Sequence, residues 1–160
     1  MRLKSQSITN KESLMSKPKL MTYEDGTQEW HLNDAIHRVD GPAVIYPDGT
    51  QEWWLNDKRH REDGPAVIHL NGDMEWWLHN KLHREDGPAI IRPDGDMDWW
   101  LNHKLHREDG PAIIRADGDM EWWIEGNKIK EFKLLEFETK ETIFKTKTTI
   151  PIEKVIRKIV

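Results

Sequence analysis

The chain has 160 residues, no cysteine and a formal net charge of −5. The lack of cysteine excludes disulfides and thiolate zinc sites and favours a reducing, intracellular compartment, which we expect to be the cytoplasm. With 33% charged residues and no long apolar run near the start, the sequence predicts neither a membrane span nor secretion.

Residues 1–22 are polar and basic, with five Lys/Arg against one Glu. They show no periodicity of a helix or strand. We therefore expect a flexible basic N-terminal arm.

Residues 23–127 contain an internal repeat with a period of 23 residues. Gly-Pro-Ala begins once in each of four units, at Gly41, Gly64, Gly87 and Gly110. The units run 25–47, 48–70, 71–93 and 94–116, and a fifth begins at Asp117 and loses the pattern after Asn127. All nine tryptophans fall into two columns. The first column consists of Trp30, Trp53, Trp76, Trp99 and Trp122. The second lies one residue later in each unit and consists of His31, Trp54, Trp77, Trp100 and Trp123.

Each unit is typical of a β-hairpin. Around unit two, Pro47-Asp48-Gly49 and Asn56-Asp57-Lys58 are turn sequences that flank a run of β-formers. A second extended stretch follows from Arg59 to Glu62, then Asp63-Gly64-Pro65, then Ala66-Val67-Ile68. Pro65 argues against a central position for this second strand, unless it lies at a bulge or kink beside Gly64. The sequence therefore predicts an all-β fold: an elongated, open, twisted sheet of five tandem hairpins.

The tryptophan columns face opposite sides of such a sheet, because successive side chains of a strand alternate. We expect at least one column to be core. An aromatic column that stays exposed marks an interaction surface. The candidate binding stripe consists of Trp54, Trp77, Trp100 and Trp123.

Residues 128–160 are predicted to cap the array. Two strands are expected over 131–138 and 142–149. The apolar residues of the last ten positions then follow the spacing of an amphipathic helix, with Ile152, Val155, Ile156, Ile159 and Val160 on one face. This helix is expected to cover the end or face of the sheet; the alternative is a docking helix for a partner.

A polar motif recurs beside each Gly-Pro-Ala. We interpret it as a structural ladder in which Arg and Asp two residues apart pair with each other or with the next unit. Metal binding by one histidine column is excluded, because equivalent residues lie about 10 Å apart, two strands away. The ladder comprises His37, His60, His83 and His106; Arg38, Arg61, Arg84 and Arg107; and Asp40, Asp63, Asp86 and Asp109.

Other chemistry finds little support. Asp94, Asp96 and Asp98 alternate like calcium ligands, but the glycine spacing and the missing downstream Glu do not fit an EF-hand, so a turn and solvated strand are the preferred interpretation. An active site needs one asymmetric set of residues, whereas His and Asp recur here in every unit. We expect no enzyme activity and no cofactor.

The charge distribution along the chain indicates which kind of partner the repeat array attracts. Residues 23–127 carry ten Lys/Arg and 23 Asp/Glu, a net charge of −13, while both flanking segments are basic. An acidic array repels phosphate backbones and anionic membranes and attracts a basic protein surface. The open sheet edges add homo-oligomerisation as an alternative, because unpaired strands template pairing.

The stretch from Trp54 to His60 resembles the MORN repeat, which reads Trp-x-Asn-Gly-Lys-x-His-Gly, and its period is similar. Leu82 to Ala89 and Leu105 to Ala112 resemble the Leu-His-Arg-x-Asp-Gly-Pro-Ala signature of variant MORN-like repeats in phage, bacterial and giant-virus proteins. The chain departs from the standard repeat where Asp57, Arg61 and Asp63 replace glycines. The resemblance implies tandem hairpins with a scaffold or protein-interaction role, and in some members lipid recognition. It also implies that the expected cytoplasm is that of a bacterial or virus-infected cell.

The sequence is compatible with three functions. The first is a non-catalytic module for protein–protein interaction or scaffolding. The second is an acidic inhibitor or decoy, of a viral or phage type, that acts on a host defence or nucleic-acid-binding protein. The third is a module that binds a small anionic ligand or a lipid.

Overall fold

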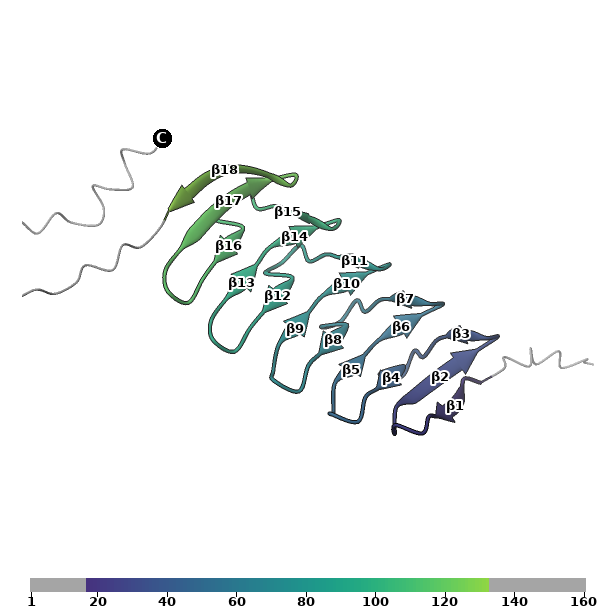
Figure 1. Cartoon of the computed structure of the whole chain (residues 1–160). Coiled ribbons are helices and arrows are strands. Elements are labelled where there is room, and N and C mark those ends of the chain that lie inside the picture. The colour runs from purple at the N-terminus through teal and green to yellow at the C-terminus, as the bar shows by residue number, and fades with distance from the viewer. Residues whose placement is uncertain (1–16, 133–160) are drawn as a thin grey trace, which may run out of the picture.

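The computed structural model describes residues 17–132, and within that range the chain is all-β. Its continuous antiparallel sheet follows the order β1-β2-β4-β5-β8-β9-β12-β13-β16-β17-β18 (Figure 1). These strands are β1 (Lys19–Thr22), β2 (Gln28–Leu32), β4 (Val44–Ile45), β5 (Gln51–Glu52), β8 (Val67–Ile68), β9 (Met74–Glu75), β12 (Ile90–Ile91), β13 (Met97–Asp98), β16 (Ile113–Ile114), β17 (Met120–Ile124) and β18 (Asn127–Phe132).

Short hairpins extend from one side of this sheet, one for each of units one to four (Figure 1). They are formed by β6 (Trp54–Leu55) with β7 (Lys58–Arg59), β10 (Trp77–Leu78) with β11 (Lys81–Leu82), and β14 (Trp100–Leu101) with β15 (Lys104–Leu105); β3 (Ala35–Ile36) pairs β2 in the same way. This architecture confirms the predicted open sheet of tandem hairpins.

Two turns fix the register of each unit, and both require a left-handed backbone. In unit two, Gly49 has φ 92° after Pro47-Asp48, and the Asp48 carboxylate accepts the Thr50 N–H at 2.8 Å. At the hairpin tip, Asn56 and Asp57 have φ 50° and 59°, the pattern of a type I′ turn. Asn and Asp tolerate this region better than other non-glycine residues.

The second half of each unit differs from the extended stretch that the sequence predicted. Residues 61–65 leave the sheet as a loop, and the chain returns to it only at Ala66, whose N–H donates to the Glu75 carbonyl. Pro65 has no N–H for a ladder, and the side chain of Arg61 closes the loop instead of a neighbouring strand. We call these loops arches; they comprise residues 38–42, 61–65, 84–88 and 107–111.

The core is thin because the sheet is a single layer. The fully buried apolar residues are small or β-branched, with Val44 and Val67 at 2% and 1% exposure and the alanines of Gly-Pro-Ala at 0%. Pairing of Val67 with Glu52 and Glu75 places these carboxylates on one face. On the other face Ile68, Met74 and their equivalents form a half-buried apolar row.

The ends of the array correct two predicted boundaries. Residues 19–22 belong to the sheet as β1, where Leu20 pairs with Trp30, so the flexible arm predicted for residues 1–22 is wrong over 19–22. At the other end β18 continues to Phe132 along β17, so the fifth hairpin is longer than predicted. The strands predicted at 131–138 and 142–149 lie largely, and the C-terminal helix entirely, outside the described residues.

Candidate functional site

Each arch is closed by one arginine. In unit two the Arg61 Nε donates to Asp63 Oδ1 at 2.7 Å, and its Nη1 donates to the Pro65 carbonyl at 3.2 Å. The guanidinium also lies over the Trp53 ring, with Cζ 4.2 Å from the centroid, a cation–π geometry. Arg38, Arg84 and Arg107 make the same three contacts in their own units.

The glycine of each arch allows this closure. A Cβ on Gly64 would lie 3.1 Å from Arg61 Cζ, closer than a side chain normally packs. The bound guanidinium lowers the pKa of the Asp63 carboxyl, first through the hydrogen bond and then through its charge. The same cause lowers the pKa of Asp40, Asp86 and Asp109. The arginines and aspartates of the predicted ladder therefore pair within one arch, not between units.

The histidines of the ladder connect neighbouring units. His60 Nδ1 accepts the backbone N–H of His79 at 3.3 Å, and His83 and His106 accept from Asn102 and Glu125 at 3.2 Å. His37 Nδ1 instead faces Asn56 Oδ1 at 2.9 Å. Each of these contacts reaches from one unit into the hairpin tip of the next.

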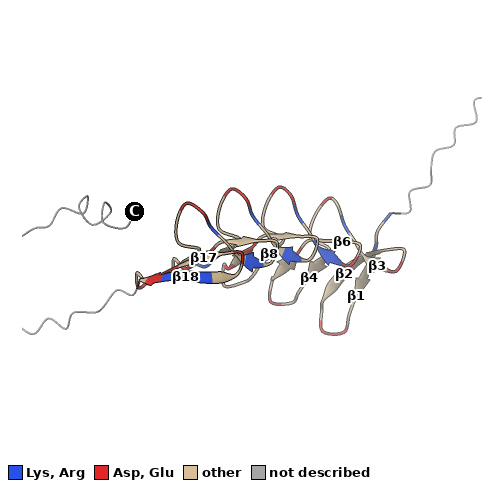
Figure 2. Cartoon of the chain, turned by 90° about the horizontal axis from the view of Figure 1, so that it is seen from above, with Lys and Arg blue, Asp and Glu red and all other residues tan. Residues whose placement is uncertain are grey.

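Neighbouring arches enclose a row of three open grooves. We name each groove by the tryptophan on its floor. The Trp53 groove lies between arches 38–42 and 61–65, the Trp76 groove between arches 61–65 and 84–88, and the Trp99 groove between arches 84–88 and 107–111. Their volumes are about 690, 830 and 710 Å³. Figure 2 shows the arches in a row along one side of the sheet, with acidic segments in red.

The floor of each groove is aromatic and aliphatic. Trp76 and Leu78, two residues apart on the same side of the strand, line the middle groove, and both are half-buried. Leu55 and Leu101 take the corresponding places beside Trp53 and Trp99. The Arg84 guanidinium lies over one face of the Trp76 ring, so the half-buried indole offers a ligand the part of its surface that the arginine leaves uncovered.

The rims of the grooves carry negative charge. The crest of each arch in units two to four presents one glutamate, Glu62, Glu85 or Glu108, with its side chain 83–84% exposed. Because Arg61 neutralises Asp63, the crest glutamate leaves the arch with a net charge of −1. The first arch differs, since Val39 occupies the crest position and is 77% exposed.

The other tryptophan column, predicted as the binding stripe, is committed to internal contacts. The indole N–H of Trp54 donates to Glu52 at 2.8 Å, and those of Trp77 and Trp123 donate to Glu75 and Glu121 at 2.7 Å. The Arg59 guanidinium lies 5.1 Å from the centroid of the Trp54 ring and 5.4 Å from that of Trp77. The centroid of the His103 ring lies 5.9 Å from that of Trp77 and 6.0 Å from that of Trp100. The indoles of this column therefore bond carboxylates on their own face of the sheet, while Trp53, Trp76 and Trp99 of the other column line the grooves.

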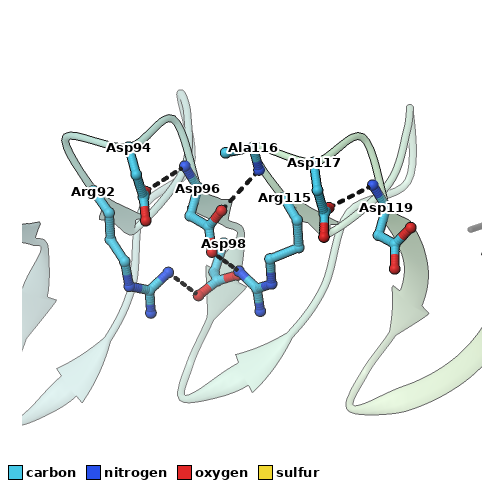
Figure 3. Close-up of polar contacts among 8 residues, drawn as sticks. All are labelled: Arg92, Asp94, Asp96, Asp98, Arg115, Ala116, Asp117 and Asp119. Carbon is cyan, nitrogen blue, oxygen red and sulfur yellow. Dashed lines mark hydrogen bonds and ion pairs between the residues drawn. The ribbon is translucent and has the colours of Figure 1, made fainter. Parts of the chain in front are cut away.

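The aspartate triplet of unit four serves local structure (Figure 3). Asp94 accepts the Asp96 N–H at 3.0 Å, and Asp96 accepts the Ala116 N–H at 2.8 Å. Asp98 is 4% exposed and pairs with Arg115 at 2.7 Å and Arg92 at 3.0 Å. Within residues 17–132, no group of three His, Asp or Glu side chains is arranged to hold a metal ion.

The crest glutamates and the groove leucines did not stand out in the sequence. The signal that could have found them is Arg-x-Asp-Gly-Pro. In this motif the arginine bonds the aspartate two residues later and the proline carbonyl, and the glycine leaves room for the guanidinium, so the segment closes into a loop. Trp53, Leu55 and the crest then belong to the same surface. The grooves could not be foreseen from alternation alone.

Comparison with known proteins adds no assignment. The chain matches no family model. It also matches no curated protein. Within residues 17–132, no helix has the length and apolar character to cross a membrane.

Proposed function

We propose that the chain is a non-catalytic protein-interaction module that binds a basic partner through the row of grooves. The single observation that carries this proposal is the threefold recurrence of an aromatic floor beneath acidic rims. Interface cores are enriched in tryptophan, and a charged rim steers an oppositely charged partner. Repetition adds avidity, because a partner that occupies one groove is held near the next.

Repetition also supports a binding role over a catalytic one. The three grooves present nearly the same side chains, whereas an active site needs groups in distinct roles. The arginines, which a phosphate or lipid headgroup would require, are already bonded to aspartates and proline carbonyls. This commitment favours a cationic partner over an anionic ligand. An inhibitor or decoy acting on a basic host protein would use the same surface.

The resemblance to MORN-like repeats supports a scaffold role of this kind. The standard repeat has glycine where this chain has Asp57, and the residues at that place, Asp57, Asn80 and His103, all have positive φ. The fifth unit has Gly126 there, with φ 81°. The chain thus keeps the backbone conformation for which glycine is the preferred residue.

The proposal can be tested by affinity capture with the full chain as bait. We expect a stoichiometric partner that is retained by the wild type and lost by the triple variant Glu62→Gln, Glu85→Gln, Glu108→Gln. The matched control changes three acids in turns outside the grooves, Glu24→Gln, Asp34→Asn and Asp73→Asn, and should retain the partner. Cross-links from the partner to arch residues would agree with this result. A partner held equally by both variants would refute the proposal.

A further inference from the structure

The crest carboxylates recur at a spacing set by strand pairing. Equivalent strands of neighbouring units, such as β5 and β9, are separated by one strand, β8. Two steps of about 4.8 Å make the repeat about 9.6 Å. Glu62, Glu85 and Glu108 therefore form a row with one negative charge about every 9.6 Å, and the Trp76 and Trp99 grooves lie between them.

A ligand that lies along this row must present cations at the same spacing and on one side. A β-strand fails, because side chains on one face recur about every 6.7 Å, and residues three apart face opposite ways. A polyproline II helix has three residues per turn and rises about 3.1 Å per residue, so every third side chain points the same way at about 9.3 Å. The mismatch is about 0.3 Å per unit, which the flexible end of a lysine absorbs.

An α-helix is the nearest competitor. Residues seven apart share a face and are about 10.5 Å apart, a mismatch of about 1 Å per unit. A helix is also about 10–12 Å wide, so its body would rest on the crests and only single side chains would reach the groove floors. A polyproline II segment is slimmer and is a known type of ligand for aromatic-lined grooves.

We infer that the partner segment is a polyproline II-like peptide with lysine or arginine at every third position, lying along the row of arches. Its cations pair with the crest glutamates, and the residues between them pack on Trp76 and Trp99. This inference rests on the proposed function, because it specifies the partner of the same grooves. Its new content is the spacing and conformation of the ligand.

The first arch supplies an internal control. Its crest residue is Val39 instead of a glutamate, so the wild-type row offers three crest charges. Val39→Glu would add a fourth charge at the same spacing, beside the Trp53 groove. Because Val39 is 77% exposed, this change should leave the fold intact, which circular dichroism and the thermal midpoint can verify.

The experiment measures dissociation constants of the full chain for synthetic peptides by calorimetry. The peptide (Lys-Pro-Pro)3 is compared with a block peptide in which three consecutive lysines precede six consecutive prolines. The block peptide has the same composition and charge, but its lysines span only about 6 Å of backbone and cannot engage all three crests. We expect (Lys-Pro-Pro)3 to bind about 2- to 25-fold more tightly, since each of the one or two additional ion pairs contributes about two- to fivefold. The triple crest variant should remove this preference.

Val39→Glu gives the second readout. It should tighten the binding of (Lys-Pro-Pro)4 about two- to fivefold. Binding of (Lys-Pro-Pro)3 should improve by at most about twofold, because the shorter peptide gains a second register but no additional ion pair.

Three results would overturn the inference. Equal binding of the two nine-residue peptides, with both lost in the crest variant, would reject the spacing and leave the proposal of a basic partner standing. Equal binding that the crest variant does not change would reject the crest surface altogether and, with it, the proposed function. Tighter binding of a helical peptide with lysine at every seventh position would reject the polyproline II conformation.

Discussion

Unit four lacks an indole–carboxylate hydrogen bond that three other units have, and one substitution should create it. In units two, three and five a glutamate accepts the indole N–H two residues later, as Glu75 does from Trp77 at 2.7 Å. Unit four has Asp98 at this place, one methylene shorter, and the buried Trp100 Nε1 has no partner among the described residues. A buried unsatisfied donor costs about 1–3 kcal/mol.

We predict that Asp98→Glu stabilises the protein by about 1 kcal/mol, the lower end of that range, because the longer side chain must also keep its arginine partners. Glu52 shows that one glutamate can accept from an indole and an arginine at the same time, since its two carboxylate oxygens accept from Trp54 and Arg59. For an array of this size the thermal midpoint should rise by about 4 °C. Tryptophan fluorescence and calorimetry would report the transition.

The reverse exchange in unit three is the matched test. Glu75→Asp should leave the Trp77 indole without its acceptor and destabilise the protein by about 1–3 kcal/mol. Glu62→Asp makes the same chemical change on an exposed crest and should stay within about 0.5 kcal/mol of the wild type. If Asp98→Glu lowers the midpoint while Glu75→Asp leaves it unchanged, the indole–carboxylate bond is not a stabilising element of the repeat.

Three further predictions concern the array itself. Ala89→Val should cost about 1–3 kcal/mol by overpacking a fully buried site, whereas Ala116→Val at an exposed site should be nearly neutral in the same denaturation assay. Gly72→Ala should destabilise more than Gly49→Ala, because both glycines have φ +92° but only the Cβ at 72 meets a proline carbon at 3.0 Å; equal losses would rule out this clash. The pKa of Asp86 is lowered, so the stability from its pairing with Arg84 is complete above the ordinary value of 3.8 and is lost as the pH falls through the folded pKa. The stability advantage of the wild type over Asp86→Asn should therefore shrink in acid. A difference that stays constant with pH would contradict this prediction.

The period of the sequence was sufficient to predict the architecture. Gly49, Asn56 and Asp57 identify both turns of a unit, and their 23-residue spacing predicts tandem hairpins in one open sheet. The alternation of Trp53, Trp54 and Leu55 also predicted opposite faces for the two tryptophan columns, and the groove contacts of Trp53 and the bond from Trp54 to Glu52 lie on those faces.

The site could not be predicted in the same way, because it depends on three-dimensional closure. Only the Arg61 side chain, folded back over Trp53 and onto the Pro65 carbonyl, turns residues 61–65 into an arch instead of a strand. The choice between the two tryptophan columns depended on hydrogen bonds that alternation does not encode. The Trp54 indole reaches a buried carboxylate, and the Trp53 column is left to line the grooves.

The most direct test of the groove surface follows the nine indole N–H signals by nuclear magnetic resonance during a titration with (Lys-Pro-Pro)3. The signals of Trp76 and Trp99 should shift, because these rings line the grooves between the crest glutamates. The signals of Trp54, Trp77 and Trp123 should stay in place, because their N–H groups are bonded to carboxylates on the opposite face. Shifts confined to this second set would contradict the account and place the binding surface on the other side of the sheet.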